Sequence, residues 1–383
     1  MINYMLAKLE SQMRQTVHLQ KGGDFPTALE GYELILEALR YYEELGYDQE
    51  TENVRRLALE AQPNPAMTLY FYALILFYRR RCTCALEAIQ AALSFAPNIP
   101  ILCLLKGRIQ TALGDFSGAY ETFIRIQELD PSSSIANDSL FLLATEKEMP
   151  GGDYYEWLQR FHQWLRPTSY VEVGLGHGRS LALAGRDTKV IGIDPYQGFW
   201  ERLNYVCPHG PATLFPLTSD DFFKQYDLLK VLGQEDFDLG FIDGLHLFEQ
   251  VLKDFINLEK YARKDSVILI HDCLPIAPIV AERESYPGFW TGDVWRIIPC
   301  LKAFRPDLKI MTIPSKPSGL GVVTNLDAAS TVLSDNYDSI VSYYLTLSCP
   351  ESFEQLRVVC SVGPADEEYV KMQFCGKSEL LIN

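Results

Sequence analysis

The spacing of hydrophobic residues divides the chain into two kinds of structure. Residues 1–150 carry Leu, Ala and Tyr at helical spacing without strand-like alternation, which predicts an all-α region. From Ser169 onward, short apolar runs alternate with helical stretches and predict strands at 170–173, 189–193, 237–242, 266–270, 308–313 and 320–324. Such an alternation favours an α/β sheet covered by helices on both faces. We therefore expect a helical domain over 1–150, an α/β domain over 151–330 and a C-terminal extension over 331–383.

The helical region contains an internal repeat. Its key positions, Ala73, Ala85, Ile89 and Pro97, recur one unit later as Gly107, Ala119, Phe123 and Pro131. Small residues let paired helices approach closely, and the proline ends the second helix. This spacing resembles the tetratricopeptide repeat (TPR). The resemblance implies a TPR-like domain that binds a protein partner, a peptide or a second copy of the chain. The alternative is a helical scaffold that packs on the α/β domain or makes a dimer.

Charge and cysteine content restrict the partners and the compartment. The formal net charge is −16, which repels a phosphate backbone and argues against nucleic acid as a partner. The nine cysteines are an odd number and form no pair of CxxC motifs, so reduced thiols in the cytoplasm fit better than disulfides or zinc. The longest apolar stretch, Leu69–Tyr78, is too short for a membrane span.

A glycine-rich loop follows the first expected strand. Gly174, Gly176 and Gly178 allow a sharp turn close to a ligand, and the residues from Arg179 are expected to open a helix. Asp194 ends the next strand about 20 residues after the first glycine, where an acid accepts hydrogen bonds from ribose hydroxyls. A dinucleotide site requires a third glycine where Arg179 stands.

The GxGxG spacing after Glu172 instead resembles class I S-adenosylmethionine (SAM)-dependent methyltransferases. That resemblance implies a Rossmann-like, seven-stranded methyltransferase sheet. It assigns the methionine part of the cofactor to Glu172 and the glycine loop, the ribose to Asp194, and adenine to the segment that begins at Ser219. The implied cofactor-binding residues are Glu172, Gly174, Leu175, Gly176, Gly178, Asp194, Ser219, Asp220 and Asp243. Helix capping is the alternative role for Asp194 and for the segment at Ser219.

Two expected strands end in aspartates. Asp243 follows the strand expected at 237–242, and Asp272 follows the one expected at 266–270. Both should therefore reach the same edge of a parallel sheet as Asp194. Two carboxylates there could hold Mg²⁺, which would make a bound hydroxyl more acidic. His246, one short turn beyond Asp243, could then remove the proton. The alternatives are loop caps for the aspartates and a packed histidine.

The segments Phe241–His246 (FIDGLH), His271–Asp272 and Gly292–Trp295 (GDVW) closely resemble a methyltransferase group found beside polysaccharide and natural-product genes. The resemblance implies Asp243 and Asp272 as metal ligands and His246 as the base. Some metal-dependent relatives carry a second acid where this chain has His271, which puts the metal in question. The expected acceptor pocket consists of His271, Trp290, Asp293 and Trp295. The alternatives are a structural or supporting role for His271, a helix cap for Asp293 and core packing for Trp290 and Trp295.

These observations predict an enzyme that methylates an oxygen of a sugar or another small hydroxylated acceptor. A second reading is a methyltransferase for a peptide or protein recruited by the TPR-like domain. A third is a non-catalytic SAM-binding scaffold, although the acids and the histidine at the strand ends argue against it.

Overall fold

The computed structural model describes residues 65–78, 80–130, 133–176, 178–195, 212–285 and 288–375. The chain divides into two compact units, Met1–Leu143 and Ala144–Asn383. Residues 1–64 of the expected helical region lie outside the described residues. Among the described helices, none is both long and apolar enough to cross a membrane.

The described part of the first unit is helical. Its helices are α4 (Pro65–Tyr78), α5 (Cys82–Phe95), α6 (Pro100–Ala112), α7 (Phe116–Leu129) and the first part of α8 (Ser134–Glu148). Helices α6 and α7 pack closely, because a Cβ atom on Gly107 would lie 2.2 Å from Cε1 of Phe123. Ala85 and Ala119, at the repeated small positions, are fully buried. The resemblance to TPR units stays a prediction.

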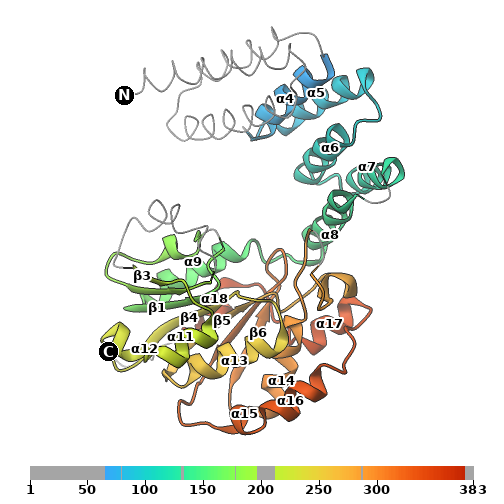
Figure 1. The fold of residues 1–383 in the computed structure, drawn as a ribbon. Coiled ribbons are helices and arrows are strands. Elements are labelled where there is room, and N and C mark those ends of the chain that lie inside the picture. The colour runs from blue at the N-terminus through green and yellow to red at the C-terminus, as the bar shows by residue number, and fades with distance from the viewer. Residues whose placement is uncertain are drawn as a thin grey trace. The chain divides into compact units, whose positions relative to one another are not determined.

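The second unit contains a seven-stranded sheet (Figure 1) with the order β3-β2-β1-β4-β5-β7-β6. The strands are β1 (Ser169–Val173), β2 (Lys189–Ile193), β3 (Ala212–Phe215), β4 (Phe237–Ile242), β5 (Ala262–His271), β6 (Lys309–Ile313) and β7 (Leu320–Thr324). Strands β1 to β5 are parallel, and β7 is antiparallel to both β5 and β6. This is the α/β, Rossmann-like methyltransferase sheet that was expected, and the expectation is confirmed.

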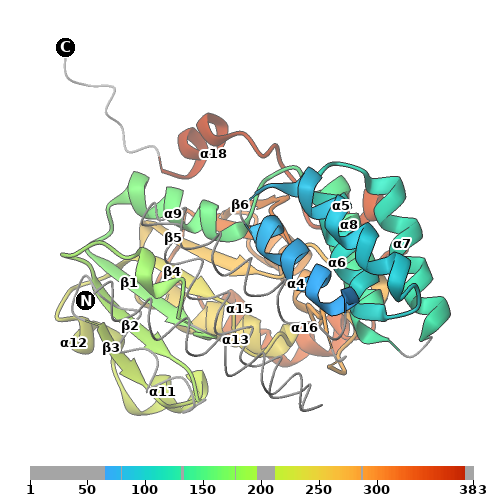
Figure 2. The same cartoon turned by 90° about the horizontal axis from the view of Figure 1, so that it is seen from above.

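Helices cover both faces of this sheet (Figure 2). One face packs against α11 (Ser219–Gln225), α12 (Leu228–Leu232), α13 (Phe248–Glu259), α14 (Ile297–Phe304), α15 (Val332–Asp335) and α16 (Tyr337–Tyr344). The other face packs against α9 (Tyr154–Leu165) and α18 (Glu367–Phe374). Helix α17 (Phe353–Val359) lies between α16 and α18 in the chain. The C-terminal extension therefore contributes a helix to each layer.

The segment after the glycine loop differs from the expected helix. It forms only a single 3₁₀ turn, η1 (Leu181–Leu183), before β2 begins. A turn closes directly behind it, since the N–H of Thr188 donates to the Gly185 carbonyl and the Thr188 hydroxyl donates to Pro167 O. This turn ends the helical segment before β2.

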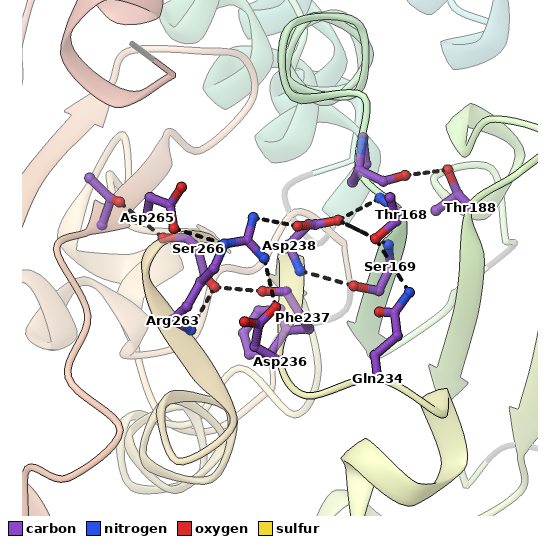
Figure 3. A network of polar contacts seen from close by, with 12 residues as sticks. Thr168, Ser169, Thr188, Gln234, Asp236, Phe237, Asp238, Arg263, Asp265 and Ser266 are labelled. Carbon is purple, nitrogen blue, oxygen red and sulfur yellow. Dashed lines mark hydrogen bonds and ion pairs between the residues drawn. The ribbon is translucent and has the colours of Figure 1, made fainter. Parts of the chain in front are cut away.

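Figure 3 shows a polar network at the amino ends of β1, β4 and β5. Arg263 pairs with Asp236 and Asp265 at 2.7 Å each and also with Asp238. Asp238 in turn accepts hydrogen bonds from the backbone N–H and the hydroxyl of Thr168. These contacts join three strands at one edge of the sheet. The carboxyl ends of the strands, at the opposite edge, carry the candidate site.

Candidate cofactor and acceptor site

A cavity of about 770 Å³ opens at the carboxyl ends of β1, β2, β4 and β5. Most of the expected site residues line it: Glu172, Gly174, Leu175, Gly176, Asp194, Ser219, Asp220, Asp243, His246, His271, Asp272 and Trp290. Gly178, Asp293 and Trp295 do not line it. The topology explains this convergence, because parallel strands deliver their carboxyl ends to one edge of the sheet.

The glycine loop approaches the β4 loop very closely. A Cβ atom on Gly174 would lie 2.0 Å from the backbone oxygen of Asp243, so no other residue fits without displacing the backbone. Gly174, Gly176 and Gly178 have φ values of 86°, 47° and 69°, a region that favours glycine. Gly178 shapes the turn through its N–H, which donates to Leu175 O at 2.6 Å. The loop is thereby fixed against the segment that carries Asp243.

Two acids hold the loop from behind. Glu172 is buried and accepts hydrogen bonds from the Tyr170 hydroxyl at 2.8 Å and from the Ser180 hydroxyl. Burial raises the pKa of Glu172 to about 8, although both hydrogen bonds act in the opposite direction. Asp194 accepts the Leu175 N–H at 2.8 Å through one carboxylate oxygen. The two carboxyl groups therefore orient the loop as well as lining the cavity.

A polar group lines the cavity at the start of α11. The Thr218 hydroxyl caps this helix, so Ser219 and Asp220 are not its cap. Gln250 donates to Ser219 Oγ and Asp220 Oδ1, both at 3.1 Å, and to Asp254 Oδ1 at 3.0 Å. Sequence reasoning missed Asp254. The available signal was an acid in the middle of the mostly apolar buried face of α13.

Asp243, His246, His271 and Asp272 form a compact cluster. Asp243 Oδ1 lies 3.3 Å from His246 Nε2 and 3.1 Å from His271 Nδ1. Asp272 Oδ2 lies 3.2 Å from His246 Nδ1 and 3.3 Å from His271 Nδ1. Each histidine therefore contacts both carboxylates.

Opposite charges set the protonation of this cluster. Burial lowers the pKa of His246, but Asp272 and Asp243 outweigh it and raise the pKa to about 9. The same balance raises the pKa of His271 well above its ordinary value. For Asp243, burial is outweighed by the two histidines, which hold its pKa well below the usual range. Without a further cation, both imidazoles are therefore protonated near neutral pH.

The cluster also suits a metal ion. Asp243, His246 and Asp272 each offer a donor atom within 4.8 Å of the others. His246 Nδ1 and Asp272 Oδ2 are buried and lie 3.2 Å apart, but neither atom forms a hydrogen bond of good geometry among the described residues. Such atoms match a divalent cation, and an imidazole beside two carboxylates suits Zn²⁺ or Mn²⁺ as well as Mg²⁺. His246 is thus placed to act either as a ligand or as a base.

Aromatic rings cover both histidines. The Trp290 indole stacks on His246 with ring centroids 5.4 Å apart, and Tyr154 lies on His271 with centroids 4.0 Å apart. Sequence reasoning missed Tyr154 and Tyr155, which line the cavity from the first turn of α9. Their signal was an aromatic pair directly after a helix-capping aspartate, outside the sheet pattern.

Asp293 and Trp295, two of the residues expected in the acceptor pocket, do not line the cavity. Trp295 is 2% exposed and belongs to the core. Asp293 is fully buried, and its carboxylate accepts the Phe248 N–H at 2.7 Å. It therefore caps the neighbouring helix α13, and not the helix that follows it in the chain.

A family model described as a methyltransferase domain matches residues 171–273. No protein of curated function matches the chain in sequence. Solved structures with some similarity include TomG of Streptomyces achromogenes, an O-methyltransferase of tomaymycin synthesis in complex with SAM, at 17% identity and a TM-score of 0.35; 45% of this chain and 80% of that chain are covered.

A putative O-methyltransferase from Klebsiella pneumoniae is similar at 16% identity and a TM-score of 0.35, covering 53% of this chain and 94% of that one. An O-methyltransferase from Bacillus cereus in complex with S-adenosylhomocysteine (SAH) is similar at 13% identity and a TM-score of 0.34. The match covers 54% of this chain and 99% of that one. The family match extends from β1 to the residue after Asp272. The part of the chain that matches the methyltransferase-domain model includes the glycine loop, Asp194, Asp243, His246 and Asp272.

Proposed function

We propose that the chain is a SAM-dependent methyltransferase that methylates a hydroxyl oxygen of a small acceptor, a sugar or another polyol. One observation carries the proposal. A single cavity is lined both by the glycine loop and Asp194 and by the cluster of Asp243, His246, His271 and Asp272. A methyl donor and an acceptor hydroxyl bound there would lie side by side.

The loop side of the cavity fits the cofactor. The Asp194 carboxylate, at the tip of β2, would accept hydrogen bonds from ribose hydroxyls. Ser219 and Asp220 would lie near adenine. The glycine loop would face the methionine part, and Glu172 would act mainly by orienting this loop through Ser180. Much of the rate enhancement would come from holding the two reactants in line with water excluded.

The cluster side fits the acceptor. In the reaction the bond from sulfur to the methyl carbon breaks, a bond from the acceptor oxygen to that carbon forms, and the hydroxyl proton leaves. His246 is our candidate for the proton acceptor, with Asp243 and Asp272 as metal ligands. A divalent cation would supply Lewis-acid activation of the hydroxyl. His246 must be neutral to accept a proton, and its raised pKa means that the cluster must lose a proton before turnover.

The remaining parts of the chain belong to the same proposal. Residues 1–150 would form a TPR-like domain that binds a protein partner or a second copy of the chain. Residues 151–330 would form the catalytic domain and 331–383 an extension. The cysteines in the described residues are free thiols, which supports a cytoplasmic location.

An acceptor screen tests the proposal. The full chain is incubated with methyl-labelled SAM and with separate metabolite, glycan and peptide fractions. We expect label in a polyol of the metabolite or glycan fractions, and His246→Ala should slow its transfer by about 10²- to 10⁴-fold. Label only in the peptide fraction would favour the peptide methyltransferase. Binding of SAH with no transfer to any fraction would favour the non-catalytic scaffold.

A further inference from the structure

His246 has an unusual backbone. Its φ of 59° lies in the left-handed region, which residues with a Cβ atom rarely adopt. Its side chain nevertheless lies between two carboxylates. Nε2 is 3.3 Å from Asp243 Oδ1, and Nδ1 is 3.2 Å from Asp272 Oδ2. Contacts from elsewhere in the fold must hold this turn, because its own sequence does not favour the conformation.

Asp293 supplies these contacts on both sides of residue 247. Its backbone N–H donates to His246 O at 3.2 Å, and its side-chain Oδ1 accepts the Phe248 N–H at 2.7 Å. Leu247 is the N-cap of α13 and provides no side-chain cap of its own. One residue from a distant loop thus bonds the backbone before and after the turn that presents His246.

Asp293 is itself firmly held. It is fully buried, and its second oxygen lies 2.7 Å from Arg283 Nη1 and 2.9 Å from Arg296 Nη1. Arg283 also forms a forked pair with Glu249 in the first turn of α13, at 2.7 and 2.9 Å. Two cations and the helix N-terminus therefore fix the orientation of the Asp293 carboxylate.

The C-terminal extension reaches the same point. Arg296 donates to the carbonyl of Tyr344 at 2.8 Å and to that of Leu347 at 2.7 Å. The Tyr337 hydroxyl donates to Glu249 O at 3.0 Å. A continuous set of polar contacts thus joins α16 to Asp293 and through it to His246.

Gly292 permits the close approach. A Cβ atom at this position would lie 1.8 Å from His246 O, well inside any van der Waals contact. Its φ of 58° adds a second reason for glycine. The backbone of residues 292 and 293 therefore lies directly against the His246 carbonyl.

We propose that Gly292 and Asp293 are positioning residues that fix the His246 ring between the two carboxylates. Neither lines the cavity, so they would act only through His246. The catalytic consequence rests on the proposed function, whereas the positioning itself can be measured without any acceptor. The assignment also gives the C-terminal extension a role, because α16 holds Arg296 and Arg296 in turn contacts Asp293.

The test compares two glycine variants of the full chain. Gly292→Ala adds a Cβ against His246 O, while Gly233→Ala is the matched control. Gly233 has a similar φ of 62°, but its Cβ would meet only Lys189 Nζ at 3.6 Å. Both variants carry the strain of a left-handed alanine, and only the first displaces the His246 carbonyl.

The readout is the NMR signal of the His246 ring in protein with ¹³C-labelled histidine. The Trp290 indole should shift this signal by its ring current, and Trp290→Leu identifies the signal by abolishing the shift. We expect Gly292→Ala to reduce the shift and Gly233→Ala to leave it as in the wild type. With an acceptor in hand, Gly292→Ala should lower kcat by about 10²-fold, as misplacement of a reacting group does, while SAH affinity stays within about twofold.

Asp293→Asn answers the same question if Gly292→Ala does not fold. It keeps an oxygen for the Phe248 N–H but removes the charge that Arg283 and Arg296 hold, so the His246 signal should again move. A folded variant with an unchanged His246 signal overturns the positioning role, as does an equal change in Gly233→Ala. If Gly292→Ala displaces His246 but the wild-type chain does not bind SAH, the positioning role is upheld and the proposed function is rejected.

Discussion

His246 and Trp290 lie face to face, with ring centroids 5.4 Å apart and ring planes inclined by only 22°. The indole N–H donates to Glu282 O at 2.7 Å, which fixes the ring in this orientation. The indole therefore covers one face of the candidate base within the cavity lining. An acceptor bound beside His246 would contact this aromatic surface.

Replacing Trp290 should weaken acceptor binding more than cofactor binding. Trp290→Leu is expected to raise the acceptor KM by roughly 2- to 10-fold, the usual contribution of an aromatic contact beyond its buried area. Trp290→Phe should retain most of the effect. Trp164→Phe, at a partly buried position near the end of α9, is the control. A change in SAH affinity as large as the change in KM would contradict a role confined to the acceptor.

Removing a metal should inactivate the enzyme if the cluster binds one. Asp243→Asn and Asp272→Asn are expected to abolish the activity that a chelator also removes from the wild type. Calorimetry with Mn²⁺ should show one site in the wild type and none in either variant. Asp221→Asn, an exposed acid outside the cavity, should behave as the wild type. Full activity in the presence of the chelator would leave the aspartates as hydrogen-bonding partners of the acceptor.

Asp254 should make stability depend on pH. Burial raises the pKa of Asp254 to about 6, above the ordinary value of 3.8 that applies in the unfolded chain. The unfolded chain therefore ionises first, and stability falls as pH rises from about 4 to 6. Asp254→Asn should match the wild type near pH 4 and be more stable at pH 7, by up to about 3 kcal/mol.

Denaturant unfolding at several pH values measures this difference, with Asp220→Asn as the control of opposite sign. Burial raises the pKa of Asp220, but hydrogen bonds from Gln250 and Lys253 outweigh it, so its pKa is lowered. Removing that charge should reduce stability at pH 7 and not increase it. A pH-independent difference for Asp254→Asn would show that the carboxyl is ionised in the folded state.

Helix α9 should be indispensable to the catalytic domain, whereas the preceding helices should not be. Trp157, Leu158 and Phe161 of α9 are buried against the sheet, at about 2–3 kcal/mol each. A fragment that begins at Pro150 is expected to bind SAH. One that begins at Pro167 should be unfolded or aggregated by circular dichroism and sedimentation. A folded fragment from Pro150 that fails to bind SAH would show that the first unit contributes to cofactor binding.

The sequence allowed the sheet to be predicted well because its signal is local. The bounds of β2 and β7 agree with the apolar runs, and Asp243 and Asp272 lie where strand ends in a parallel sheet must meet. The short 3₁₀ turn after the glycine loop was not predicted, because helical propensity there is overridden by the turn that starts β2.

Residues whose roles depend on tertiary contacts were the ones that sequence reasoning misjudged or missed. Asp293 suits a cap for the helix that follows it, yet it caps α13, 45 positions back in the chain. Tyr154 precedes the sheet in the chain. It reaches the cavity only because α9 packs against one face of the sheet. Neither contact leaves a periodic signal, since each joins segments that are distant in sequence.

Calorimetry with SAH tests the central claim most directly. The wild-type chain should bind SAH and should not bind NADH. Asp194→Ala should weaken SAH binding by roughly 10- to 150-fold, the value of hydrogen bonds to a charged group. Asp187→Ala removes an exposed acid from the connection between β1 and β2, before the strand that Asp194 follows, and should leave affinity unchanged. Tight binding of NADH with no binding of SAH would contradict the assignment of this cavity to a methyl donor.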